Sequence, residues 1–339
     1  MVTKYESWLA NLEGRGDGSI QAGVHVIKTL YNNNTEFFVN LAKGCKYVRL
    51  GPTGGEERKN EHMMTDRWGC EWHFPGGYLD GQVTGHPIDD WGKYKEYKFP
   101  KPEDFTDWPK AEDRMKKVIT TGGIPSAGFE HGHYFLKLTY LRGFENAMVD
   151  FMEEPPEFVD LTEKLADYWV SVIKRYSDIG VKYFTFGDDL GFQTALPVSP
   201  VKWAKFIQPG YTRIFKACHA NGGKVYLHTD GKIIDIIPNL ITCGVDILNP
   251  QDSVNGIDNL VALAKGKVYL DLDVDRQNVT VFGTPAEIEK HLTECVQKLG
   301  SPTGGLSLKY GVYEGTPIEN VAAVVKTMES LGGYWLKKS

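Results

Sequence analysis

The chain has 339 residues, enough for one α/β barrel or for two ordinary domains, and its content of 24% charged and 41% hydrophobic residues is that of a soluble globular protein. The net charge of −6 provides no general basic surface, which argues against nucleic acid or an anionic membrane as a partner. The five cysteines are scattered and form no CxxC pair, there is no bilayer-length apolar run, and no signal pattern opens the chain. We therefore expect a cytoplasmic protein without a disulfide framework.

The first third of the chain contains one recognisable strand, at 47–50, followed by an irregular segment at about 51–107. This segment is rich in glycine and aromatic residues, including Trp68 and Trp72, and breaks the pattern of the rest. We interpret it as an insertion of hairpins and loops that forms a lid over a barrel mouth, where it would exclude water and contact a substrate. A small structural subdomain that plugs one end of the barrel is the alternative.

From about residue 120 a rhythm of short apolar run, polar end and amphipathic stretch repeats along the chain. Strands are expected at 124–129, 181–186, 224–228, 245–248, 268–272 and 305–309. Helices are expected from Pro155 to a stop at Gly180, from Ser199 to Ala220, at 232–243, from Thr284 to Leu299, and at 317–331. This alternation predicts a parallel sheet, and a single (βα)8 barrel domain over 1–339 is its natural closure. A doubly wound open sheet is the alternative, although no strand is followed by a dinucleotide-binding or P-loop glycine pattern.

The polar ends of the strands are the candidate site, because the active sites of α/β barrels lie at that face. In KVYLHTDG the apolar run ends at His228, and alternation along a strand places His228 and Asp230 on the same side. Such a pair can bind a metal, exchange a proton or hold a polar substrate. A purely structural pair is the alternative.

A second polar end contains Glu130, His131 and His133. Their spacing puts His131 and His133 on one face, which would suit a metal, but the intervening glycine favours a loop. We expect these two histidines to contact substrate.

Two further strands end in carboxylates. Asp188 and Asp189 are neighbours, so one should face the barrel interior, to bind substrate or orient His228, while the other caps a loop or helix. On the later strand Asp271, Asp273 and Asp275 follow one another at spacing two, and three carboxylates on one buried face would repel strongly. Salt bridges at the barrel rim are favoured there, with Arg276 beside Asp275 as a partner.

Tyr310 ends the last strand and Glu314 follows closely. A phenol in that place could donate a proton to a leaving oxygen, although tyrosines more commonly pack over a core rim.

Several of these stretches together resemble the uroporphyrinogen decarboxylase superfamily. The likeness is carried by 181–200 (VKYFTFGDDLGFQTALPVSP), 225–251 and 283–320, and covers most of the chain after about residue 65. Within the superfamily the chain is most similar to the corrinoid-dependent methyltransferase branch, and the resemblance implies the α/β barrel fold. The decarboxylases carry an N-terminal arginine-rich motif for the carboxylates of the porphyrin, and the chain has no such stretch. Porphyrin decarboxylation is therefore the alternative reading.

The methyltransferase branch implies transfer of a methyl group to or from a corrinoid held on a partner protein. Its thiol-methylating members bind zinc through His-x-Cys and a later cysteine. Here His228 matches the histidine, Asp230 stands in place of the first cysteine and Tyr310 roughly in place of the second. Two possibilities remain open: a harder zinc site of His228, Asp230 and Glu314, or protein acids acting without metal.

The aromatic lid suggests a methoxylated aromatic donor, as in the O-demethylases of this branch. The resemblance then implies that a cob(I)alamin on a corrinoid protein takes the methyl group while an acid reaches the ether oxygen. The expected catalytic residues are His228, Asp230, Tyr310 and Asp189. The expected substrate-binding residues are Trp68, Trp72, His131, His133, Phe135, Asp188 and Gln251. Related barrels often pair, which leaves a homodimer open, and a non-catalytic ligand-binding barrel is a further alternative.

Overall fold

The computed structural model describes residues 3–53, 61–76 and 81–336, which fall into two compact units. The first unit comprises Glu6–Glu56 and Ile247–Ser339, and the second comprises Glu57–Asp246 together with Thr3–Tyr5. Each unit is described by itself.

The first unit is built on a parallel sheet in the order β2-β1-β11-β10-β9. The strands are β1 (Ala22–Ile27), β2 (Val48–Thr53), β9 (Ile247–Pro250), β10 (Tyr269–Asp273) and β11 (Leu306–Val312). Strand β1 was not predicted, although its alternate residues Ala22, Val24 and Val26 are buried, the period of a strand. Its Val24 lies opposite Tyr310 of β11, so the first strand of the chain pairs with the last.

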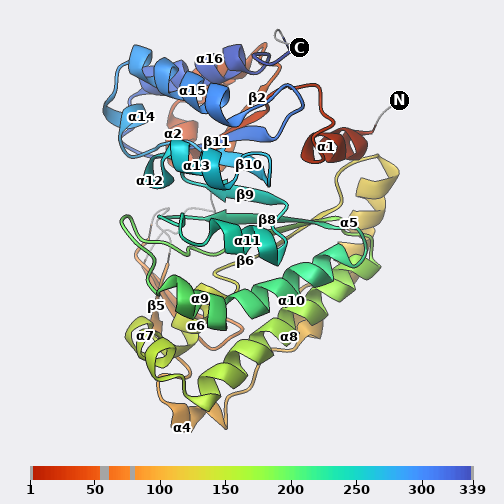
Figure 1. The fold of residues 1–339 in the computed structure, drawn as a ribbon, viewed down its shortest axis with the longest axis vertical. Helices are drawn as coiled ribbons and strands as arrows, with labels where there is room; N and C mark the ends of the chain where they lie inside the picture. The colour runs from red at the N-terminus through yellow and green to blue at the C-terminus, as the bar shows by residue number, and fades with distance from the viewer. Residues whose placement is uncertain (1–2, 54–60, 77–80, 337–339) are drawn as a thin grey trace. The chain divides into compact units, whose positions relative to one another are not determined.

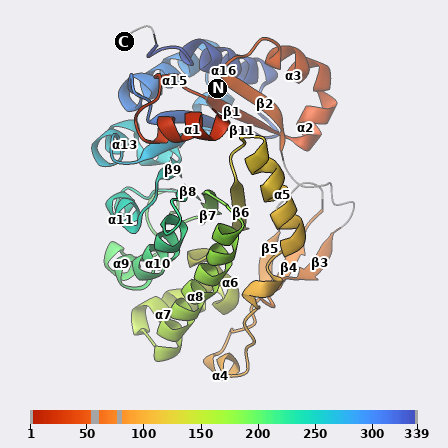
Figure 2. The ribbon, with the colours of Figure 1, turned by 90° about the vertical axis from the view of Figure 1, so that its right-hand side faces the viewer.

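The two long helices at the C-terminal end of this unit were predicted from the sequence, and its shorter helices were not. The helices of the unit are α2 (Lys28–Asn33), α3 (Thr35–Ala42), α12 (Asp252–Asn255), α13 (Ile257–Leu263), α14 (Val279–Phe282), α15 (Pro285–Leu299) and α16 (Ile318–Leu331); α1 (Lys4–Leu12) begins the chain. Helix α15 starts where expected, because Thr284 and Glu287 form a capping box. Helices α15 and α16 lie side by side (Figure 2).

The second unit contains the parallel strands β6 (Ser126–His131), β7 (Tyr183–Gly187) and β8 (Lys224–Thr229) in chain order. Its main helices are α5 (Trp108–Thr120), α6 (Phe135–Arg142), α7 (Phe144–Glu153), α8 (Pro156–Asp178), α9 (Pro200–Phe206), α10 (Gln208–His219) and α11 (Ile237–Cys243). The predicted apolar stripe of α8 is buried throughout, and α8 packs along α10 (Figure 1).

Two predicted helices are shorter or broken. The helix expected from Ser199 to Ala220 is interrupted at Ile207, because Pro209 lacks an N–H and starts a new helix in its first turn. The helix expected at 232–243 begins only at Ile237, where Pro238 occupies a first-turn position. The backbone N–H of Lys232 instead donates to the carbonyl of Phe192, which holds the preceding residues in a loop.

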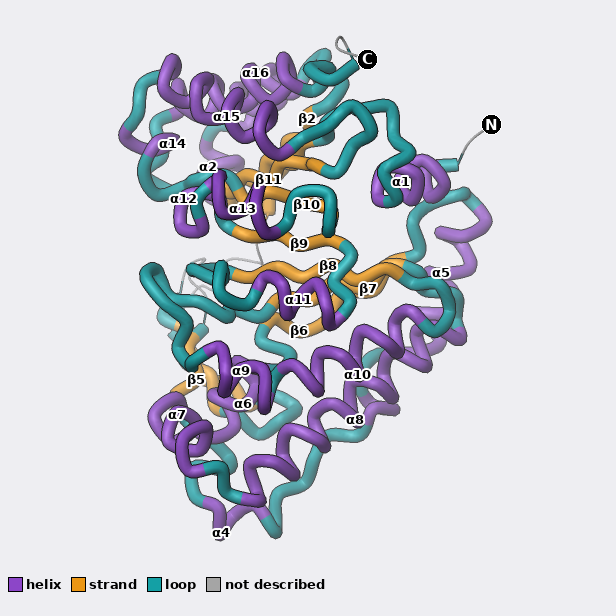
Figure 3. The backbone as a smooth tube through the Cα atoms, in the orientation of Figure 1, coloured by secondary structure: helices purple, strands orange, loops and turns teal. Residues whose placement is uncertain are grey.

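The segment expected to be a lid contains an antiparallel sheet of β3 (His62–Thr65), β4 (Glu71–Phe74) and β5 (Gln82–Gly85); all three strands are labelled in Figure 2, and β5 also in Figure 3. The short α4 (Trp91–Tyr94) and the 3-10 turn η1 (Pro102–Asp104) follow. Residues 54–60 and 77–80 of this segment lie outside the described residues, and the lid role remains a prediction.

Parallel strands that alternate with helices confirm the α/β class. Within each unit neighbouring strands follow chain order, and β1 closes on β11, as barrel topology requires; a doubly wound sheet instead reverses its order at a switch point. The single-domain reading of the chain stays a prediction. Among the described residues no helix combines the length and the apolar character needed to cross a membrane.

Candidate functional site

Three polar side chains converge where β6, β7 and β8 end: His131, Asp189 and His228. The Nε2 atom of His131 lies 3.3 Å from Oδ1 of Asp189, and the rings of His131 and His228 have centroids 6.0 Å apart. One ligand atom from each residue lies within 4.8 Å of those of the other two. The register explains this convergence, because Gly187 lies opposite both His131 and His228 in the parallel sheet.

Asp189 connects the three strand ends. Its Oδ1 also accepts a hydrogen bond of 3.1 Å from the backbone N–H of Asp230. Burial alone would raise the pKa of Asp189, but the hydrogen bond and charge of His131 outweigh it and the pKa is lowered. Correspondingly, the hydrogen bond to Asp189 raises the pKa of His131. The pair therefore favours a carboxylate beside an imidazolium.

His228 and Asp230 lie on the same side, as expected. Nε2 of His228 is 3.6 Å from Oδ1 of Asp230, and both side chains are partly exposed. Together with His131, whose side chain is 50% exposed, they give this strand edge an accessible polar surface. Accessible acids and bases of this kind can exchange protons with a bound molecule.

The expectation that His131 and His133 share a face is wrong. Gly132 has φ of 72°, a left-handed conformation that breaks strand alternation, and His133 is fully buried. Its ring lies among those of Phe186 and Tyr211, and burial lowers its pKa. His133 therefore sits as a neutral core residue, and a substrate contact from it remains only a prediction.

Of the two neighbouring aspartates, Asp188 is the capping residue. Its carboxylate accepts the backbone N–H groups of Phe135 at 2.6 Å and Leu136 at 2.9 Å, at the start of α6, and the hydroxyl of Tyr211 at 2.7 Å. It is fully buried. Asp189 is thus the one that faces His131, and the predicted substrate contact of the buried Asp188 remains a prediction.

The predicted aromatic contacts lie beside this edge but are largely packed. Trp68 is buried and donates from Nε1 to Glu130 at 2.8 Å, and the same carboxyl group pairs with Arg67 and Lys137. The carboxylate of Glu130 thus holds three neighbouring side chains in place. Phe135 is buried as well. Trp72 is partly buried, with its Nε1 bonded to Asp66 at 2.9 Å. Their stacking on a substrate stays a prediction.

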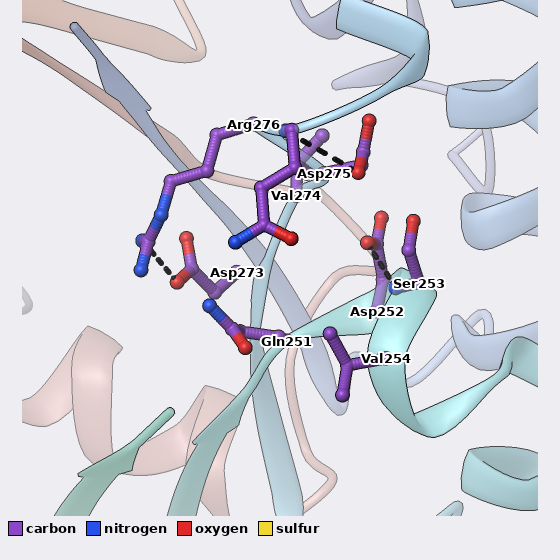
Figure 4. Close-up of a pocket in the computed structure, with 9 residues that line it drawn as sticks. Gln251, Asp252, Ser253, Val254, Asp273, Val274, Asp275 and Arg276 are labelled. Carbon is purple, nitrogen blue, oxygen red and sulfur yellow. Dashed lines mark hydrogen bonds and ion pairs between the residues drawn. The ribbon is translucent and has the colours of Figure 1, made fainter. Parts of the chain in front are cut away.

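In the first unit a small pocket lies at the ends of β9 and β10 (Figure 4). Gln251, Asp273 and Arg276 line it. Arg276 turns back so that Nη1 meets Oδ2 of Asp273 at 2.6 Å. This corrects the expected Arg276–Asp275 pair: the carboxylate of Asp275 accepts the backbone N–H groups that start α14, including that of Val279 at 2.6 Å. Gln251 therefore lines a pocket, and its contact with a substrate remains a prediction.

The remaining two candidates also belong to the first unit. Tyr310 is fully buried, and burial raises the pKa of its phenol, so it stays protonated. Glu314 is exposed and belongs to none of the three-residue groups of metal ligands found among the described residues. Their participation in a common site with His228 and Asp230 remains a prediction.

His131, Asp189 and His228 are chemically suited to a divalent metal. Two imidazole nitrogens and a carboxylate oxygen are the donor set of catalytic zinc sites that keep an open position. Sequence reasoning assigned His228 to a metal but did not join it to His131 and Asp189. The available signal was that three consecutive parallel strands end in these residues, and such ends meet at one edge.

Comparison with known proteins identifies the family. The uroporphyrinogen decarboxylase (URO-D) family model matches residues 62–331. The uroporphyrinogen decarboxylase of Hordeum vulgare is 27% identical over 61% of this chain and 61% of its own length. The uroporphyrinogen decarboxylase of Parasynechococcus marenigrum is 27% identical over 51% of this chain and 48% of its own length. A methyltransferase from Methanosarcina mazei has a similar fold, with a TM-score of 0.65 and 15% identity over 97% of this chain and 99% of that one. The chain belongs to the uroporphyrinogen decarboxylase family.

Proposed function

We propose that this protein is a methyltransferase that moves a methyl group from a methoxylated aromatic compound to a corrinoid held on a partner protein. The observation that carries the proposal is the convergence of His131, Asp189 and His228 at the ends of three adjacent strands. The fold similarity to the Methanosarcina mazei methyltransferase along nearly the whole chain supports the same class of reaction.

The chemical demand of ether cleavage fits these side chains. When the methyl–oxygen bond breaks, its electron pair stays on the oxygen, and a phenolate leaves poorly unless that oxygen is protonated or coordinated. The reduced corrinoid supplies the nucleophile that accepts the methyl carbon. His131, whose pKa is raised by its hydrogen bond to Asp189, would supply the proton to the ether oxygen, and His228 lies beside it to orient the donor.

A divalent metal would serve the same oxygen as a Lewis acid. His131, Asp189 and His228 would hold it, with Asp230 beside His228. This ligand set differs from the set of His228, Asp230 and Glu314, one of the two possibilities that the sequence leaves open, which remains a prediction. Proton donation and metal coordination exclude each other at Nε2 of His131, so the metal content of the active protein and of His131→Gln separates them: coordination predicts less bound metal in the variant, and proton donation predicts the same amount.

Porphyrinogen decarboxylation is the second candidate, supported by the names of the curated relatives. The charge at the β6–β8 edge disfavours it. Asp189 and Asp230 are partly exposed there beside His131 and His228, so these four side chains offer no surplus of positive charge to a substrate that carries many carboxylates. The decarboxylase reading therefore needs basic groups that sequence reasoning did not find.

The test is anaerobic methyl transfer. Purified protein is mixed with reduced cobalamin, with or without a corrinoid protein, and with a panel of methoxylated phenols, while the absorbance of the methylated corrinoid is followed. His131→Gln should lower the rate by roughly 10²- to 10⁴-fold, the usual contribution of a general acid. His219→Gln is the matched control, because His219 forms a similar pair with Asp246, at 2.7 Å, away from these strand ends.

Two results would contradict the proposal. Carbon dioxide release from a porphyrinogen, without methyl transfer from any donor, would establish the decarboxylase. An unchanged rate for a folded His131→Gln protein would remove the assigned acid.

A further inference from the structure

A second group of metal-ligand side chains lies in the first unit, outside the candidate site: Asp252, His291 and Cys295. Nε2 of His291 lies 2.7 Å from Oδ2 of Asp252. The Sγ atom of Cys295 lies 3.9 Å from that oxygen and 3.8 Å from that nitrogen. Three different donor atoms thus face one point.

Local structure explains the convergence. His291 and Cys295 are four residues apart on α15, which places them on the same face one turn apart. Asp252 opens α12 directly after β9, and its other oxygen is bonded to the backbone N–H of Ser253. Asp252 and Cys295 are fully buried and His291 is partly buried, so the ligands are held by the core on one side and open on the other.

The spacing is close to that of a tetrahedral zinc site. Bonds of about 2.0–2.3 Å to zinc place neighbouring ligand atoms roughly 3.3–3.6 Å apart. The two distances from sulfur are a few tenths of an ångström longer, and the distance between His291 and Asp252 is shorter because a proton joins them. Replacing that proton by a cation requires only small side-chain movements.

The charges nearby favour a cation. Asp252, Asp275 and Glu294 all contribute negative potential at His291. Lys298 pairs with Glu294 at 2.7 Å and offsets its charge, so Asp252 and Asp275 are the main source of the negative potential at His291. Burial raises the pKa of the Cys295 thiol, so it stays protonated until a metal displaces its proton. Asp252 and Asp275 also line the small pocket of Figure 4.

We propose that Asp252, His291 and Cys295 form a structural binding site for a divalent transition metal, with Zn²⁺ as the best fit. Carboxylate, imidazole and thiolate together suit zinc better than Mg²⁺ or Ca²⁺, which take oxygen ligands. The metal joins α12 to α15. Because Gln251 immediately precedes α12, the site fixes the end of β9 where the pocket is formed.

Cobalt substitution tests this site without reference to activity. Chelator-treated full-length protein is titrated with Co²⁺, and the thiolate-to-cobalt charge-transfer band is recorded. The cluster of His131, Asp189 and His228 contains no thiol and cannot produce that band. The expected result is a band that grows with added Co²⁺ until it saturates, together with a thermal unfolding midpoint that rises with added Zn²⁺.

Variants assign the band to residues. Cys295→Ser should abolish it, and His291→Gln should weaken cobalt binding by roughly 100-fold or more, since indirect changes around a site alone cost about 10- to 100-fold. Cys70→Ser is the matched control, because Cys70 is equally buried but its thiol bonds to the carbonyl of Tyr140. A wild-type protein without the band in excess Co²⁺ would overturn the proposal, whatever the variants do. A band retained in folded Cys295→Ser or unaltered in His291→Gln would also overturn it.

Discussion

Oδ1 of Asp189 lies 3.3 Å from Nε2 of His131, and the same oxygen accepts the backbone N–H of Asp230. One carboxylate therefore sets the protonation of a histidine on β6 and the position of the residue that follows β8. This dual contact makes Asp189 the residue through which the chemistry of the β6–β8 edge is most readily changed.

Asp189→Asn should shift the pH dependence of activity. His131 has a raised pKa because Asp189 accepts its proton, so the acid form persists to higher pH than in a free histidine. Loss of the charge should move the basic limb of the kcat/KM profile down by roughly 1 pH unit. Asp246→Asn, which alters the His219 pair, should leave the profile in place. An unmoved basic limb in Asp189→Asn would show that His131 is not the titrating acid.

Asp188→Ala should act on stability instead. It leaves the backbone N–H groups of Phe135 and Leu136 and the hydroxyl of Tyr211 without their buried acceptor. We expect the free energy of unfolding to fall by about 3 kcal/mol in urea denaturation, the scale of unsatisfied buried groups. Asp189→Ala, which is partly exposed and accepts one backbone N–H, should lose about 1 kcal/mol. Equal losses for the two variants would contradict the division of roles between them.

The alternation of strands and helices was predictable because each repeat carries its own apolar run and cap. The missed strand β1 also had a signal in its buried Val24 and Val26. Contacts set by single backbone angles were harder to predict: Gly132 turns His133 into the core, although spacing alone puts it beside His131. The partner of Arg276 depended on how the chain turns after β10, a local geometry that spacing does not determine.

The histidines predict opposite effects of pH on folding. Burial lowers the pKa of His133, so the unfolded chain binds its proton first, and stability falls as pH drops below about 6.5. The raised pKa of His131 has the opposite effect on folding stability. The stabilisation that His131 contributes is fully present below about pH 6.5 and is lost as the pH rises through the pKa of His131 in the folded protein. Urea unfolding at pH 7.5 and 5.5 should therefore show a smaller loss on acidification in His133→Gln than in wild type. His131→Gln should show a larger loss, and the same sign for both variants would refute this account.

Gly231, which follows Asp230, should not tolerate a side chain. Its φ is 83°, and a Cβ there would lie 1.9 Å from the backbone oxygen of Gly191, which cannot withdraw as a flexible side chain could. Gly231→Ala should therefore separate the loops after β7 and β8, with a loss of several kcal/mol in unfolding free energy, well above the roughly 1–2 kcal/mol cost of a left-handed alanine alone. Gly222→Ala is the matched control: its φ is 70°, but no atom lies within 4 Å of the added carbon. Gly222→Ala should therefore lose only the unfolding free energy that a left-handed alanine costs, and it should retain methyl transfer. If thermal and urea unfolding give the same loss for both variants, the close approach of Gly191 to Gly231 does not hold the β7 and β8 ends together.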